Sequence, residues 1–91
     1  MTKFIGGSAP AMANQLMEGY ILINPVMLKR FTLEELRSLR VELEKLQRET
    51  RSQQIPKDDI PAIQIKNHRL QKIGSSLLII RNYCQKVYRQ T

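Results

Sequence analysis

The sequence is poor in the residues from which disulfides, metal sites and aromatic platforms are built. Its 91 residues include one cysteine, one histidine and no tryptophan, and aromatic residues make up only 5%. The single cysteine, Cys84, excludes an intramolecular disulfide and a cysteine-rich zinc site, and it favours a reducing compartment. No carboxylate lies near His68 in the sequence. We therefore predict no metal site and no cofactor.

Long hydrophobic runs are also missing. No stretch approaches the roughly 20 apolar residues needed to cross a membrane, and the first residues lack the apolar run of a signal peptide. We therefore expect a cytoplasmic protein without a transmembrane segment. Hydrophobic residues make up 42% of the chain, which is enough for one small domain, residues 1–91, with a thin core.

Motifs for catalysis are absent as well. His68 has no nucleophile or carboxylate at a recognisable spacing, and the glycine pair Gly6–Gly7 matches neither phosphate-binding loop pattern. Cys84 falls on an apolar helical seam, where a buried and inert thiol is expected. The sequence therefore predicts a protein that is not an enzyme.

Acidic residues are missing from the last third of the chain. Residues 62–91 contain six basic residues and no acidic one, whereas residues 32–54 contain five of each, and the whole chain carries a net charge of +7. This charge favours an acidic partner, which is a nucleic acid, an anionic membrane surface or an acidic protein.

The clearest local signal that is present marks a helix start at Thr32. Thr32 and Glu35 form a capping box, and Phe31 and Leu36 occupy the two positions of a hydrophobic staple. We predict a helix over residues 32–54. Its outer face offers ion pairs at i, i+4 spacing, namely Arg40–Glu44, Glu44–Arg48 and Lys45–Glu49.

Two apolar seams with alternating spacings of three and four residues predict two helices that pack together. The first seam is Leu36, Leu39, Leu43 and Leu46, and the second is Ile63, Leu70, Ile73, Leu77, Ile80, Cys84 and Val87, with Lys66 in one slot. Residues 55–61 contain two prolines and form a turn, in which Asp58 or Asp59 caps the second helix, residues 62–91. The predicted fold is therefore all-α, an antiparallel, coiled-coil-like two-helix hairpin.

The residues before the hairpin predict a short helix and a connector. Residues 1–8 are expected to be flexible, and Ser8 can cap a helix that Gly19 ends. The apolar run Tyr20–Ile23 is either an extended segment packed across the helices or a strand that needs a partner edge. Asn24 and Pro25 then start a further helical turn within the segment 9–31.

The apolar surface of the second long helix is too wide for one neighbouring helix. Ile65, Ile79 and Tyr83 widen its seam to about half of the circumference. Either the segment 9–31 covers the rest and completes a monomeric three-helix bundle, or a second protomer does so in a dimeric four-helix bundle. We predict a homodimer, and the candidate partner-binding residues are Tyr20, Ile21, Leu22, Ile23, Ile65, Ile79 and Tyr83.

The function that these patterns favour is that of a small adaptor or regulatory subunit, which binds another protein through helix surfaces. The alternative is a basic protein associated with nucleic acid or the ribosome. Its candidate phosphate contacts are Arg69, Lys72, Arg81, Lys86 and Arg89. These side chains scatter around the helix, whereas a phosphate-tracking stripe should be narrower.

Overall fold

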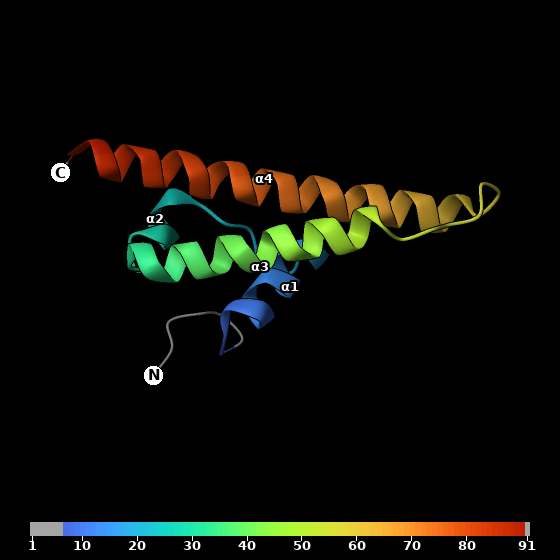
Figure 1. Ribbon diagram of the computed structural model, residues 1–91, viewed down its shortest axis with the longest axis horizontal. Helices are drawn as coiled ribbons and strands as arrows, with labels where there is room; N and C mark the ends of the chain where they lie inside the picture. Colours follow the sequence, from blue (N-terminus) through green and yellow to red (C-terminus); the bar gives the residue numbers. More distant parts are fainter. Residues whose placement is uncertain (1–6, 91) are drawn as a thin grey trace.

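Four helices and no strand make up the part of the chain that the structure describes. The computed structural model describes residues 7–90, with side chains as far as residue 87. The helices are α1 (Ala9–Glu18), α2 (Pro25–Leu28), α3 (Leu33–Arg51) and α4 (Ile60–Gln90). Figure 1 shows α3 and α4 side by side in opposite directions, with α1 and α2 against this hairpin. The predicted all-α hairpin is confirmed, and the predicted flexibility of residues 1–8 falls largely outside the described residues.

Helix α3 begins at the predicted capping box. The Glu35 backbone N–H donates to Thr32 Oγ1 at 3.1 Å, and the Thr32 N–H donates to Glu35 Oε1 at 2.8 Å. Phe31 and Leu36 are both buried, as the staple requires. The helix ends at Arg51, within a few residues of the predicted boundary. Local capping chemistry therefore sets this start without help from the rest of the fold.

The other helix ends also follow side-chain chemistry. Ser8 Oγ accepts from the Ala11 N–H at 3.3 Å to start α1, and Gly19 ends this helix with a φ of 81°, where a side chain would be strained. Of the two candidate aspartates, Asp59 caps α4, because its Oδ1 accepts from the Ala62 N–H at 3.3 Å. Helix α4 accordingly starts at Ile60, two residues before the prediction.

The hairpin seam forms the centre of the core. Leu36, Leu39 and Leu43 of α3 and Ile73 and Ile80 of α4 have no exposed surface. The side chains of Leu46, Leu77 and Cys84 are partly buried against this cluster. Each fully buried side chain of this size contributes about 1.5–3 kcal/mol through the hydrophobic effect. The predicted packing of the two seams is therefore confirmed at its centre.

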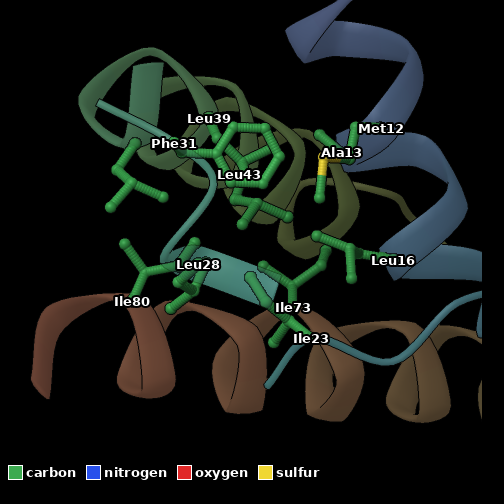
Figure 2. Close-up of a cluster of buried hydrophobic side chains, with 11 residues drawn as sticks. Met12, Ala13, Leu16, Ile23, Leu28, Phe31, Leu39, Leu43, Ile73 and Ile80 are labelled. Carbon is green, nitrogen blue, oxygen red and sulfur yellow. The ribbon is translucent and has the colours of Figure 1, made fainter. Parts of the chain in front are cut away.

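The N-terminal third of the chain supplies the rest of the core. Met12 and Leu16 of α1, Ile23 of the connector and Leu28 of α2 are buried among the residues of the hairpin. Figure 2 shows these side chains meeting between α1, α3 and α4. The connector is irregular between α1 and α2, as the extended alternative predicted. Part of the wide apolar surface of α4 is therefore covered within one chain.

The lysine in the second seam has a structural partner. Lys66 Nζ donates to the backbone carbonyls of Gln53 at 2.8 Å and Arg51 at 3.3 Å. The last carbonyls of a helix lack partners within the helix and carry its negative dipole end. Lys66 therefore holds the end of α3 against the first turns of α4 and aligns the hairpin.

Candidate functional site

The connector, predicted as a partner surface, is split between core and solvent. Ile23 is only 7% exposed and Ile21 is partly buried against the core, whereas Tyr20 is 79% and Leu22 67% exposed. Ile23 therefore belongs to the core, and Tyr20 and Leu22 are the residues of this run that are exposed to a partner. The physical reason is that a short connector between α1 and α2 lies directly over the seam, so its apolar side chains alternate between the core and the solvent.

The three predicted residues on the flank of α4 also have different environments. Ile65 is 53% exposed, whereas Ile79 and Tyr83 pack partly against the core. Ile79 and Tyr83 line a depression between α4 and α2, together with Pro25 and Lys29. They do not form a free flank, because α2 covers part of this side of the helix.

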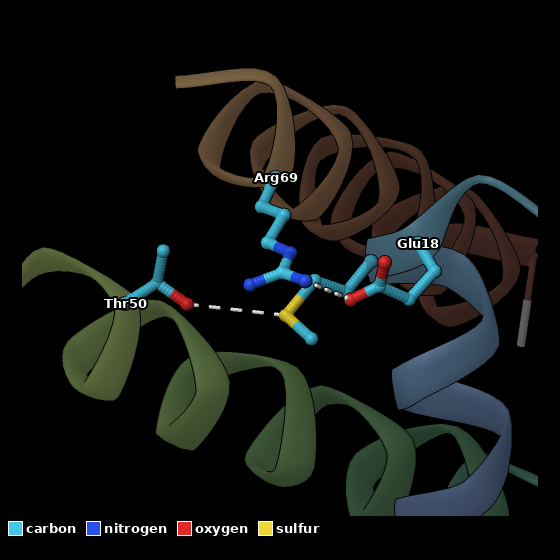
Figure 3. Close-up of polar contacts among 4 residues, drawn as sticks. Glu18, Thr50 and Arg69 are labelled. Carbon is cyan, nitrogen blue, oxygen red and sulfur yellow. Dashed lines mark hydrogen bonds and ion pairs between the residues drawn. The ribbon is translucent and has the colours of Figure 1, made fainter. Parts of the chain in front are cut away.

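Two of the predicted phosphate contacts lie near the end of α1, and one of them forms an ion pair there. Arg69 Nη2 lies 3.0 Å from Glu18 Oε1, and each side chain is about one third exposed (Figure 3). The Lys72 side chain lies beside Gly19, at the end of α1. A phosphate contact at Arg69 therefore stays a prediction, and it would have to compete with Glu18. The ion pair links α1 to α4.

The remaining predicted phosphate contacts do not meet on one face. Arg81 lies between α3 and α4, whereas Lys86 lies in the depression beside α2. The side chain of Arg89 lies outside the described ones. The structure therefore shows no continuous basic stripe among the described side chains of α4.

A groove with a volume of about 660 Å³ lies between the two long helices. We call it the hairpin groove. It is lined entirely by α3 and α4, with Arg40, Glu44, Gln47, Arg48, Gly74, Leu77, Leu78 and Arg81. Neither α1 nor α2 contributes a lining residue, so the N-terminal third leaves this side of the hairpin open.

Two leucines of α4 line the hairpin groove, and there is open space beside them. Leu78 is 56% exposed, and Leu77 packs partly on the core. A Cβ atom placed on Gly74 would meet no atom within 4 Å, so this glycine leaves open space and does not serve a close helix approach. Its neighbour Ser75 is exposed and Ser76 is buried, so the three small residues 74–76 do not form one surface.

The rim of the hairpin groove is basic. Arg40 Nε lies 3.7 Å from Glu44 Oε1, and both side chains are about half exposed. Arg48 and Arg81 form no ion pair within the part of the chain that the structure describes, although Arg48 stands at pairing distance from Glu44 in the sequence. One carboxylate therefore faces three guanidinium groups.

Sequence reasoning missed the hairpin groove, although its spacing is visible in the sequence. The lining residues of α4 follow positions i, i+3, i+4 and i+7, and those of α3 follow i, i+4, i+7 and i+8. Each set therefore lies on one face of its helix. Arg40 and Arg48 were assigned to surface ion pairs, and only the register of the hairpin brings them opposite Arg81.

The described residues hold neither a metal-binding cluster nor a membrane-spanning helix. No group of three or more His, Cys, Asp or Glu side chains lies close enough there to hold a metal ion. The described helices include none with the length and apolar composition of a membrane span. Comparison with protein-family models, with curated proteins and with solved structures finds no match for this chain.

Proposed function

We propose that this protein is a small, non-enzymatic interaction module that binds another protein through the hairpin groove. The observation that carries the proposal is the exposure of Leu78, which is 56% exposed and lines a groove to which the described residues outside α3 and α4 contribute nothing. Covering a leucine of this kind contributes up to about 1.5–3 kcal/mol to binding. The cytoplasm is the proposed location, which the single cysteine supports.

The nucleic-acid alternative has less support. Arg69 is paired with Glu18, and Arg81 and Lys86 lie in different concavities. The exposed Leu78 in the hairpin groove offers an apolar contact, which a phosphate backbone does not use, because its binding comes from Lys and Arg neutralising the phosphates. Nucleic acid is therefore a competing outcome of the experiment below.

Homodimerisation stays a prediction. The core residues that α1 and the connector contribute support a monomer that folds without a second copy. A symmetric contact through the hairpin groove would also bring the three arginines of one copy against those of the other. We therefore propose a different protein as the partner, and sedimentation of the purified chain tests for a dimer directly.

The proposal is tested by affinity capture from a lysate of the cells that produce the protein, with and without nuclease treatment. The bait is the wild-type protein, the groove variant Leu78→Glu, or the control Val41→Glu. Val41 is also about half exposed on a long helix, but it lies outside the hairpin groove. A third variant, Leu22→Glu, tests the exposed part of the connector.

The expected result is a protein that wild type and Val41→Glu retain and that Leu78→Glu loses. Loss with Leu22→Glu alone would place the binding surface on the connector and refute the assignment to the groove. Capture that disappears on nuclease treatment would favour the nucleic-acid function instead.

A further inference from the structure

The hairpin groove carries a net positive charge, although the predicted segment of the first long helix is neutral as a whole. Residues 32–54 are neutral as a whole, but two of their arginines, Arg40 and Arg48, lie on the side facing α4, where Arg81 joins them. Glu44 is the one acidic residue of the lining. The groove therefore combines two leucine side chains with a net positive charge.

We propose that the hairpin groove binds an acidic amphipathic helix of another protein. An apolar side chain of this helix enters the space above Gly74 and covers Leu77 and Leu78. Its flanking Asp or Glu side chains pair with the guanidinium groups of Arg48 and Arg81. A carboxylate can form two parallel hydrogen bonds with a guanidinium group. This inference rests on the proposed function and specifies the chemistry of the partner.

The shape of the groove favours a helical occupant over an extended one. An extended peptide gains affinity by adding a strand to an exposed sheet edge, but the backbone groups of α3 and α4 are already bonded within their helices. A helix needs only side-chain contacts in a groove between two helices. The lining of α4 from Gly74 to Arg81 spans about 10 Å, which matches two turns of an added helix.

Charge complementarity also separates this occupant from the other classes. A second copy would bring a lining of three arginines and one glutamate against the same lining, and a nucleic acid offers phosphates but no apolar contact for Leu78. An acidic amphipathic helix offers both carboxylates for the arginines and an apolar face for the leucines. The rim charges steer the encounter and select the partner, and the leucines hold it.

The test measures binding of the full-length protein to two synthetic peptides by fluorescence anisotropy at low and moderate salt. Each peptide is an amidated helix of about 16 residues, or four to five turns, with leucines at positions i, i+3 and i+4. Glu flanks the leucines in one peptide and Lys flanks them in the other. The variants Arg48→Glu and Arg81→Glu, called the rim variants, reverse the charge of one arginine in the groove. The control Arg37→Glu makes the same charge reversal on the exposed surface of α3 outside the groove.

We expect the Glu peptide to bind at least about tenfold more tightly than the Lys peptide. Added salt should weaken the binding of the Glu peptide. Each rim variant should weaken the Glu peptide by about five- to tenfold, whereas Arg37→Glu should change its affinity by less than about twofold. Circular dichroism shows whether each variant keeps its helical content, and all three sites are exposed in the free protein.

Three outcomes overturn the inference: equal affinity for both peptides, equal effects of Arg37→Glu and the rim variants, or tighter binding of a DNA duplex that Leu78→Glu leaves unchanged. If the lysate experiment still captures a protein that depends on Leu78, the proposed function stands and only the acidic chemistry of the partner is wrong. If Leu78→Glu has no effect there, the function itself fails.

Discussion

Truncating Leu28 tests whether the N-terminal third of the chain belongs to the core. Leu28 has no exposed surface, and it lies between α3 and α4 on the short helix α2 (Figure 2). Leu28→Ala removes three buried carbon atoms and leaves a cavity, which typically costs about 2–5 kcal/mol. A chain of this length has a free energy of unfolding of about 5–14 kcal/mol, so the variant loses a large part of its stability.

The matched control is the same substitution at Leu22. Leu22 lies on the connector that leads to α2 but is 67% exposed, so Leu22→Ala should change the free energy of unfolding by less than about 0.5 kcal/mol. Urea titration followed by circular dichroism at 222 nm gives both values, provided that the slopes agree among the variants. If both substitutions lowered the free energy of unfolding by the same small amount, the packing of α2 into the core would be refuted.

Two further predictions concern the polar contacts that join the helices. Lys66→Met keeps the aliphatic stem but removes both hydrogen bonds to the end of α3. We therefore expect thermal unfolding to show a decrease of about 1–2 kcal/mol in the free energy of unfolding. The control Lys57→Met changes an exposed lysine and should cause no measurable change. A double-mutant cycle with Glu18→Gln and Arg69→Met should give a coupling energy of about 0.5–1 kcal/mol that decreases with added salt, because both side chains are partly exposed. Zero coupling at low salt would show that the ion pair does not hold α1 on α4.

The helix ends and the central seam were predictable because their causes are local. The Thr32–Glu35 box, the glycine stop at Gly19 and the cap at Asp59 each involve residues within one turn of each other. Three- and four-residue spacings likewise identified Leu39 and Ile73 as core residues. None of these features needs knowledge of how distant segments meet.

The candidate site was predicted less well because it depends on contacts between distant segments. Ile23 and Leu22 are both apolar neighbours in one run, and no periodicity shows which of them reaches the core. Arg69 belongs to a basic helix in the sequence, but Glu18, about fifty positions away, neutralises it. The charge of a helix therefore says little about which of its cations are available to a partner.

The amino-acid sequence by itself determined four helical segments, the caps of the first three, the antiparallel hairpin and the basic character of α4, because these follow from local hydrogen bonding, helical periodicity and composition. The tertiary structure alone decided that α1, the connector and α2 cover one side of the hairpin and that Lys66 holds the end of α3. It also placed Arg40, Arg48 and Arg81 around Leu78 in one groove. The physical reason is that these contacts depend on the register and the crossing of helices, which are set by the packing of the whole core.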